Sequence, residues 1–328
     1  MVFPQPGRVF SIDGEAQFSD LALEIFRFQA LNVPVYTEFI ANLRIDPHTV
    51  TRKEDIPFLP IGFFKSHPVI SKGRQAEIVF SSSGTTGAIT SRHEVASVKL
   101  YEQSFMHAFS LFYGNVSEYC VFALLPAYLE REGSSLVYMA DALIRESKHA
   151  DSGFFLYDHQ QLHAKLLRMR DAGQKTILIG VTFGLLDFAE QYTIDFPELI
   201  VMETGGMKGR RKEMIREELH ERLTRALGVQ RIHSEYGMTE MLSQAYSTGE
   251  GLFSCPPWMQ IQLRDTNDPL SPVGYGQTGG INVIDLANIY SCSFIATQDL
   301  GKIYPEGTFE PLGRFDHSDI RGCNLMVL

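Results

Sequence analysis

The sequence predicts an α/β fold, with layered β-sheets flanked by helices and a small distorted antiparallel β subdomain. Between residues 77 and 236, short apolar runs alternate with amphipathic stretches, as in a largely parallel sheet whose strands are joined by helices. After about residue 245 the apolar runs follow one another, separated by Gly, Pro, Asn and Asp, which is typical of antiparallel strands. We therefore expect an α/β core at 1–245, the β subdomain at 246–312 and a short tail at 313–328.

Composition supports a globular protein and excludes several classes of function. The 328 residues are 44% apolar, and 29 basic against 39 acidic side chains give a net charge of −10. This balance argues against a nucleic-acid binder or a protein of anionic membrane surfaces. The longest apolar run, 119–129, is broken by Pro126 and too short to span a bilayer. Without a visible secretory signal or a CxxC pair, we expect a cytoplasmic protein in a reducing compartment.

The N-terminal third contains one helical pattern, one irregular segment and the first strand. Apolar spacing predicts a helix over 20–40 that Pro34 bends or ends. Residues 56–68, rich in Pro and aromatics, predict an irregular segment packed on a core. A strand is expected at 77–80. The helix after it has an apolar face made of Val95, Val98, Tyr101, Phe105, Phe109 and Phe112.

The remaining elements follow the same alternation. A helix is expected at 134–147, and Asp158 is placed to N-cap another. A long helix is expected over 208–227, with Gly228 at its end. Strands are expected at 119–125, 154–157, 175–181, 198–203, 230–236, 258–263, 279–285 and 291–297.

Four short motifs could carry chemistry. Residues 81–87 read SSSGTTG, and two glycines with five hydroxyls between a strand and a helix can wrap phosphate oxygens. The GK[ST] of a P-loop is absent, so an ordinary turn explains this segment equally well. Residues 236–240 read YGMTE, where an aromatic ring could stack on a purine and a carboxylate could bind Mg²⁺. Residues 297–299 read TQD, 313–316 read GRFD, and each is weak alone.

Together, in this order, the four motifs resemble the adenylate-forming superfamily of acyl-CoA synthetases, luciferases and peptide-synthetase adenylation domains. That family carries SSGTTG, YGxTE, TGD and GRxD in the same sequence, and the likeness here covers 81–316. The resemblance implies ATP and Mg²⁺ as cofactors and formation of an acyl adenylate from a carboxylic acid.

The resemblance also implies roles for individual residues. The β- and γ-phosphates of ATP would be held by Ser82, Ser83, Gly84, Thr85, Thr86 and Gly87. The adenine would be framed by Gly205, Gly206, Met207, Tyr236 and Gly237. Thr239 would lie near the α-phosphate and the acyl carboxylate, and Glu240 would bind Mg²⁺. Asp299 and Arg314 would hold the ribose hydroxyls.

The sequence departs from the family pattern in several places. Residues 88–92 read AITSR in place of the usual Pro-Lys, and Arg92 could supply the missing charge. Gln298 replaces the glycine of TGD, and His317 replaces a second aspartate. Only twelve residues follow Asp316, so we expect the family's C-terminal lid domain, with its catalytic lysine, to be absent or vestigial.

The whole chain is similar to the acyl-protein synthetases of bacterial bioluminescence, which tolerate a missing lid. The segments 56–67 and 124–144 and the tail IRGCNL at 320–325 carry this likeness. It implies that a long-chain fatty acid passes from the adenylate to Cys323 as a thioester and then to an acyl reductase. Chemistry alone also supports this role, because a thiolate attacks the mixed anhydride of an acyl adenylate readily. A C-terminal tail can carry the resulting thioester to a partner, and Arg321 could lower the pKa of the neighbouring thiol.

Other interpretations stay open. The chain could be an aryl- or acyl-CoA ligase resembling phenylacetate–CoA ligases, a ligase for an acyl carrier protein, or a non-catalytic acyl- or nucleotide-binding remnant. Cys323 could be an incidental surface cysteine, whereas Cys120 and Cys292 lie in apolar runs and are expected to be buried. His93 and His233 flank motifs and could contact ligand, although structural roles are more common for such histidines. Aromatic residues at 63–64 and 128–138 could line an acyl tunnel or belong to the core.

Overall fold

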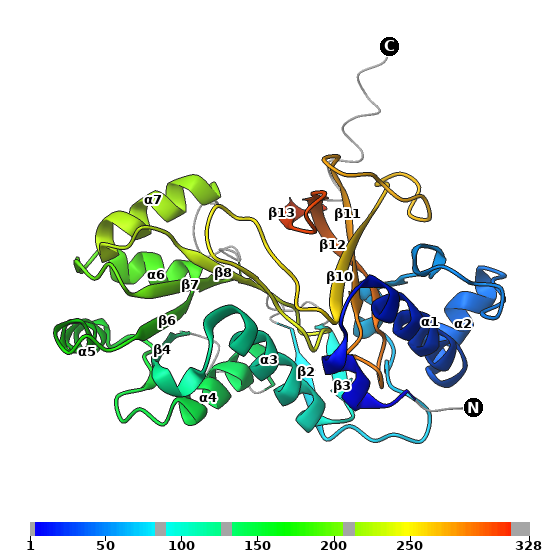
Figure 1. The fold of residues 1–328 in the computed structure, drawn as a ribbon, viewed down its shortest axis with the longest axis horizontal. Helices are drawn as coiled ribbons and strands as arrows, with labels where there is room; N and C mark the ends of the chain where they lie inside the picture. Colours follow the sequence, from blue (N-terminus) through cyan, green and yellow to red (C-terminus); the bar gives the residue numbers. More distant parts are fainter. Residues whose placement is uncertain (1–3, 83–89, 126–132, 206–213, 316–328) are drawn as a thin grey trace, which may run out of the picture. The chain divides into compact units, whose positions relative to one another are not determined.

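The computed structural model describes residues 4–82, 90–125, 133–205 and 214–315 (Figure 1). The chain forms two compact units, each described here by itself. One unit is continuous, Ala76–Pro256, and the other joins Met1–Gln75 with Pro257–Leu328. Among the described residues, none of the helices has the length and apolarity that crossing a membrane requires. The domain boundaries that the sequence predicts at residues 245 and 312 stay predictions.

The continuous unit contains a six-stranded sheet in the order β5-β4-β6-β7-β8-β9. Its strands are β4 (Cys120–Leu124), β5 (Gly153–Phe154), β6 (Thr176–Val181), β7 (Ile200–Thr204), β8 (His233–Tyr236) and β9 (Ala245–Ser247). All neighbours are parallel except β8 and β9. The predicted parallel sheet is therefore confirmed, although β5 is shorter than the expected 154–157.

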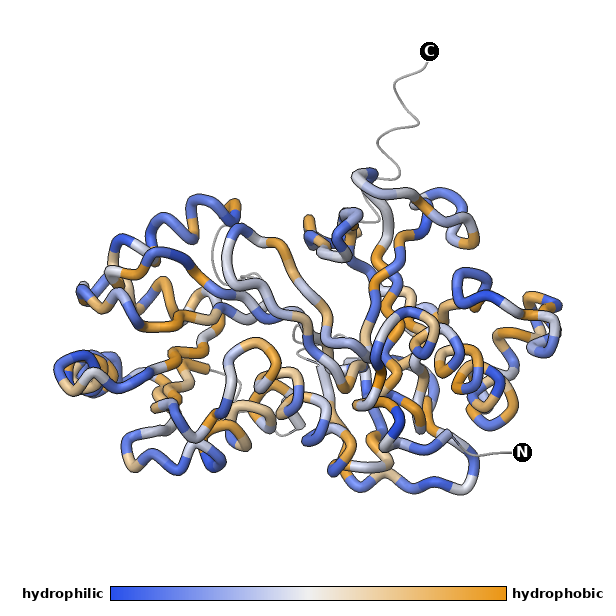
Figure 2. Tube along the Cα trace, in the orientation of Figure 1, coloured by the Kyte–Doolittle hydropathy of each residue, from blue (hydrophilic) through white to orange (hydrophobic). Residues whose placement is uncertain are grey.

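Helices cover both faces of this sheet. They are α3 (Val98–Tyr113), α4 (Ser135–Ser147), α5 (His159–Asp171), α6 (Thr182–Ala189) and α7 (Arg216–Leu227), with a short 3-10 helix η4 (Val116–Glu118). Phe122 and Leu124 of β4 pack with α5, α6 and α7, while Ala123 and Leu125 pack with Ala140 of α4. In Figure 2 the central strands are coloured hydrophobic and α5 is largely hydrophilic.

Helix ends follow the local sequence. The Asp158 carboxylate accepts a hydrogen bond from the Gln161 amide at 2.9 Å and so caps α5, as predicted. Gly228, with φ of 65°, ends α7 in the left-handed conformation. The start of that helix is corrected: Met214 and Ile215 are not helical, and α7 begins at Arg216 rather than near 208.

A hairpin of β2 (Ile78–Ser81) and β3 (Arg92–Val95) belongs to the same unit. The expected helical face over 95–112 is corrected at its start, because Val95 pairs with Ile78 in this hairpin. The helix begins only at Val98, where the Ser97 hydroxyl accepts a hydrogen bond from the Leu100 amide at 3.3 Å.

The second unit is built on a five-stranded sheet. Its order is β1-β12-β11-β10, with β13 also paired to β12. The strands are β1 (Leu59–Pro60), β10 (Met259–Arg264), β11 (Gly279–Asp285), β12 (Phe294–Ile303) and β13 (Phe309–Arg314). Every pairing is antiparallel except that of β1 with β12, so the predicted antiparallel strands are confirmed.

N-terminal helices complete this second unit. They are α1 (Glu15–Asn32) and α2 (Pro34–Asn42), separated at Pro34 as predicted, with 3-10 helices η1 (Pro6–Ser11), η2 (Lys53–Asp55) and η3 (Ile61–Lys65). The buried Gln29 amide donates to the carbonyl oxygens of Asn288 and Ile289 at 3.0 and 2.8 Å. These bonds tie α1 to the segment before β12.

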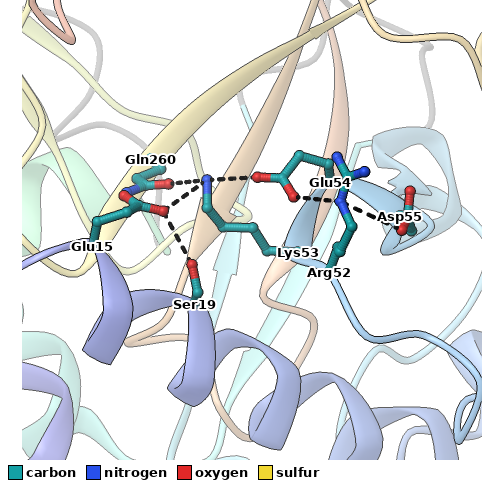
Figure 3. Close-up of polar contacts among 7 residues, drawn as sticks. All are labelled: Glu15, Ser19, Arg52, Lys53, Glu54, Asp55 and Gln260. Carbon is teal, nitrogen blue, oxygen red and sulfur yellow. Dashed lines mark hydrogen bonds and ion pairs between the residues drawn. The ribbon is translucent and has the colours of Figure 1, made fainter.

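A polar cluster also joins η2 to α1 and β10 (Figure 3). The Lys53 ammonium, on a side chain that is 14% exposed, lies 3.2 Å from Glu15 and 3.3 Å from Glu54. It also donates to Gln260 at 3.0 Å. The contacts with Glu15 and Gln260 hold η2 against α1 and the sheet.

Candidate functional site

The strand order of the continuous unit marks one edge of its sheet as a binding edge. From β4 the chain runs through α4 to β5 on one side, and from β5 it returns through α5 to β6 on the other side. In open α/β sheets, ligands bind outside the carboxyl ends of the strands at such a reversal. Thr182, Gly205 and Gly237 directly follow β6, β7 and β8 at this edge.

The YGMTE motif forms a turn at the end of β8. The Met241 amide donates to the Met238 carbonyl at 3.1 Å, which closes the turn. Tyr236 is buried at the end of the strand, Thr239 is half-buried and Glu240 is 5% exposed. The motif thus places Tyr236 at the end of β8 and Glu240 in the turn that follows, both of them buried.

Gly237 lies close to two neighbouring side chains. A Cβ atom at this position would collide with the Glu235 carboxylate and lie 3.3 Å from Gln244 Cγ. The main chain therefore passes close to two side chains immediately after Tyr236. A larger residue at this position would require the Glu235 side chain to move.

His93 supports this turn from the hairpin. Its ring is fully buried, and Nδ1 lies 2.8 Å from the Thr239 carbonyl oxygen. Because a carbonyl oxygen only accepts, Nδ1 carries the hydrogen and donates it. His93 thus fixes the main chain of Thr239, which is the structural alternative that the sequence left open.

The base of the hydroxyl-rich loop is defined by Ser82. Its hydroxyl accepts from the Ser91 amide at 2.9 Å, and its own amide donates to the Ser91 carbonyl at 3.0 Å. The Ser81 amide donates to the Gly133 carbonyl at 2.8 Å. The phosphate contacts predicted for Ser82 stay a prediction. Residues Ser83, Gly84, Thr85, Thr86, Gly87, Gly206, Met207 and Cys323 lie outside the described residues.

A second group at the edge was missed by the sequence analysis. The Glu203 carboxyl at the end of β7 lies 2.9 Å from the Thr182 hydroxyl and 3.0 Å from the Ser234 hydroxyl. Burial raises the pKa of Glu203, while hydrogen bonds from Thr182 and Ser234 and the charge of Arg216 act to lower it. The signal in the sequence was a lone acid near the end of an apolar run, directly before Thr204-Gly205-Gly206.

In the other unit, the TQD and GRFD motifs lie on paired strands. Asp299 and Arg314 are direct cross-strand partners, and Arg314 Nε lies 3.4 Å from Asp299 Oδ1. The Asp299 amide donates to the Thr297 hydroxyl at 3.1 Å. The Asp299 side chain is 13% exposed and that of Arg314 is 77% exposed. The strand pairing therefore brings together the two residues predicted to hold a ribose.

Cysteines and histidines elsewhere have structural environments. Cys120 and Cys292 are buried as predicted, and burial raises the pKa of their thiols to about 11 and about 12. Neither is suited to act as a nucleophile. His233 is half-buried, lies 3.3 Å from the Tyr113 hydroxyl, and has a pKa lowered by burial to about 4. Phe64 belongs to the core of its unit.

Solved structures share this fold. 2-Hydroxyisobutyryl-CoA ligase in the postadenylation state with R3-HIB-AMP has a TM-score of 0.68 at 12% identity, over 92% of this chain and 68% of that one. The same ligase with 2-HIB-AMP and CoA in the thioesterification state has a TM-score of 0.67 at 12% identity, over 95% and 71%. ATP-bound MatB from Rhodopseudomonas palustris has a TM-score of 0.55 at 16% identity, over 75% and 49%.

These likenesses confirm the predicted layered α/β fold. The chain spans about half the length of the MatB structure. No family model matches the sequence, and no curated protein matches it. Identities this low establish the fold, whereas activity has to be argued from the site.

Proposed function

We propose that the protein activates a carboxylic acid with ATP, forming an acyl adenylate and pyrophosphate. The observation that carries the proposal is the placement of Gly205 and the YGMTE turn at the carboxyl edge of the parallel sheet. Support comes from the fold shared with ligases that were solved with ATP or with an acyl-AMP. An aromatic ring beside two glycines suits a purine, and oxygen donors such as Glu240 are those that Mg²⁺ prefers.

In the proposed reaction, one carboxylate oxygen of the acid attacks the α-phosphorus and the bond to the bridging oxygen of pyrophosphate breaks. Tyr236 and Gly205 would hold the adenine, and Asp299 and Arg314 the ribose. Thr239 would orient the α-phosphate. Mg²⁺ bound at Glu240 would offset the charge of the leaving pyrophosphate. Catalysis of this kind rests on positioning and on charge neutralisation.

The finer proposal concerns the substrate and the acceptor. Following the likeness to acyl-protein synthetases, the acid is a long-chain fatty acid and the acyl group passes to the Cys323 thiol. The thioester then serves an acyl reductase in the cytoplasm. This proposal depends on the tail sequence at 320–325.

A CoA ligase is the second candidate. Its supporting observation is the fold likeness to 2-hydroxyisobutyryl-CoA ligase, which extends over 95% of this chain in the structure with CoA. Both candidates share the adenylation step and differ in the thiol that receives the acyl group. An acyl carrier protein as acceptor is a variant of the second candidate.

ATP–pyrophosphate exchange against a panel of fatty and aryl acids tests the shared step. Exchange should require Mg²⁺ and an acid, and Glu240→Gln should lower it by at least about 100-fold, the scale of one lost electrostatic contact in a transition state. Glu146→Gln, at an exposed position on α4, is the matched control and should exchange normally. No exchange with any acid would favour a non-catalytic binding protein.

Covalent labelling separates the two candidates. Radioactive fatty acid with ATP should label the wild-type protein, and neutral hydroxylamine should release the label as it does from a thioester. Cys323→Ser should keep exchange and lose the label, because a serine hydroxyl is a far weaker nucleophile at neutral pH. An unlabelled wild-type protein that makes acyl-CoA when CoA is added would establish the second candidate instead.

A further inference from the structure

Hydroxyl and carboxyl groups form a linear chain of hydrogen bonds at the carboxyl edge of the parallel sheet. The Thr182 hydroxyl lies 2.9 Å from Glu203 Oε2 and 2.5 Å from the Gly205 carbonyl oxygen. The Ser234 hydroxyl lies 3.0 Å from Glu203 Oε1. This series of hydrogen bonds starts on β8, crosses β7 and ends on a main-chain carbonyl. None of the nucleotide contacts proposed above uses the side chains of Thr182, Glu203 or Ser234.

The hydrogen atoms available for these hydrogen bonds can be counted. The Gly205 carbonyl only accepts, and a separation of 2.5 Å between two oxygens is that of a short O–H···O bond, so the single Thr182 proton lies between them. The contact of Thr182 with Glu203 Oε2 then needs a hydrogen from Glu203. Ser234 donates to the other carboxyl oxygen. A protonated Glu203 gives each of the three contacts its own hydrogen, whereas an ionised one leaves the single Thr182 proton shared between two acceptors.

The surroundings of Glu203 suit the protonated form. The carboxyl lies on the sheet face packed by α5, α6 and α7, opposite Gly180 of β6 in the strand register. Its partners on the flanking elements are the hydroxyls of Thr182 and Ser234. Within the described part of the chain, Arg216 of α7 is the charged group that acts on it, favouring ionisation, and burial outweighs this effect.

The main-chain conformation at Gly205 depends on the hydrogen bond that its carbonyl accepts. It has φ of 66°, in the left-handed region, and follows β7 directly. Glycine there has little conformational preference of its own, so a bond to its carbonyl decides how the peptide after it is oriented.

We propose that Glu203 is a neutral positioning residue: its acid proton holds the Thr182 hydroxyl, which in turn fixes the Gly205 carbonyl at the nucleotide edge. When Glu203 releases its proton to solvent, the Thr182 hydroxyl turns to the carboxylate and the Gly205 carbonyl loses its donor. ATP affinity therefore falls as Glu203 ionises. This last consequence rests on the proposed function, because it takes Gly205 as part of the adenine site.

Infrared spectroscopy tests the protonation without any ligand. A protonated carboxyl group absorbs apart from a carboxylate, and at about pH 6 an ordinary glutamic acid, with a pKa near 4.3, is almost wholly ionised. The difference spectrum of wild type minus Glu203→Gln should show a protonated carboxyl band at about pH 6 that disappears as the pH rises. Absence of that band would overturn the proposal.

Calorimetric titration with ATP tests the positioning. Glu203→Gln can donate to Thr182 and accept from Ser234, so it should bind ATP equally well at every pH. Wild type should lose about tenfold in affinity over the pH range in which the band disappears, the scale of one net hydrogen bond. Thr182→Val should show the weaker affinity at every pH, and the exposed control Glu198→Gln should follow wild type.

The outcomes separate this proposal from the proposed function. ATP binding without the infrared band, or the same pH profile in wild type and Glu203→Gln, would overturn the role of Glu203 alone. The band without ATP binding in any variant would overturn the proposed function and the affinity effect with it, and would leave the protonated anchor established.

Discussion

Asp299, which we propose to hold the ribose of ATP, pairs with an arginine across its sheet. Its carboxylate is 13% exposed and faces an arginine whose side chain is 77% exposed. An ion pair with so exposed a partner adds little to stability, on the order of 0–1 kcal/mol. Removal of this ion pair should therefore leave the unit folded.

Asp299→Ala should weaken ATP binding by about 1.5–3 kcal/mol, the range for hydrogen bonds to a charged group. Calorimetry on wild type, the variant and the exposed control Asp20→Ala would measure it. Urea unfolding should show a change no larger than that of a surface ion pair. Equal affinity in all three proteins would mean that the TQD motif has no part in nucleotide binding.

At the residue scale, sequence reasoning reaches motif residues and misses residues that meet only in the fold. Tyr236, Thr239 and Glu240 could be named because they are contiguous. Thr182 and Glu203 are 21 positions apart, and Glu203 and Ser234 are 31 apart. Only the parallel register of β6, β7 and β8 brings these three side chains together, and no local pattern contains that register.

Capping residues act on single elements, and α5 offers a direct test. Asp158→Ala removes the acceptor of the Gln161 amide and should lower the free energy of unfolding by about 1 kcal/mol. Asp158→Asn keeps an acceptor and should be near neutral. Urea denaturation followed by circular dichroism would measure both. A loss equal in the two variants would show that the charge of Asp158, rather than the cap, stabilises the helix.

Elements with a clear period were predictable and those without one were not. Strands β4 and β6 are buried along their length and β7 is buried at three of its five residues, and their apolar runs predicted them. Helix α6 is almost wholly buried, so it shows no polar face and the sequence analysis did not predict it. Strand β3 has the sequence RHEV, which is too polar to predict a strand, and it forms because it pairs with β2.

Stability of the whole molecule should depend on two histidines of the continuous unit. Burial lowers the pKa of His220 and of His233 to about 4, from an ordinary value of 6.5. His220 Nε2 is buried with no hydrogen-bond partner among the described residues. The unfolded chain therefore takes up protons near pH 6.5, while the folded chain does so only near pH 4.

The free energy of unfolding should consequently fall as the pH is lowered from 6.5 to 4, and level off below that. After discounting for partial exposure, the loss is on the order of 2 kcal/mol for the two groups. Urea titrations at several pH values should show a shallower acid slope in the His220→Gln, His233→Gln double variant. The exposed control His48→Gln should keep the wild-type slope, and an unchanged slope in the double variant would contradict the prediction.

The pairing of distant segments is the part of the fold that lay furthest from sequence reasoning. Leu59 and Pro60 lie in register with Ile295 and Ala296 of β12. Gln29 of α1 bonds to carbonyls 259 and 260 positions later. Helical periodicity predicts that α1 has an apolar face, but it cannot specify a partner sheet at the opposite end of the sequence.

This arrangement has a consequence for how the chain is made. Helices α1 and α2 leave the ribosome well before the strands they pack on, which lie from Pro257 onward. About 180 residues separate the two parts, and at roughly 5–20 residues per second the ribosome needs roughly 10–35 seconds to add them. Throughout that interval the apolar faces of both helices lack the strands that cover them in the folded unit. The continuous unit can meanwhile fold, so the two segments of the second unit meet only after the residues between them in the sequence have been made.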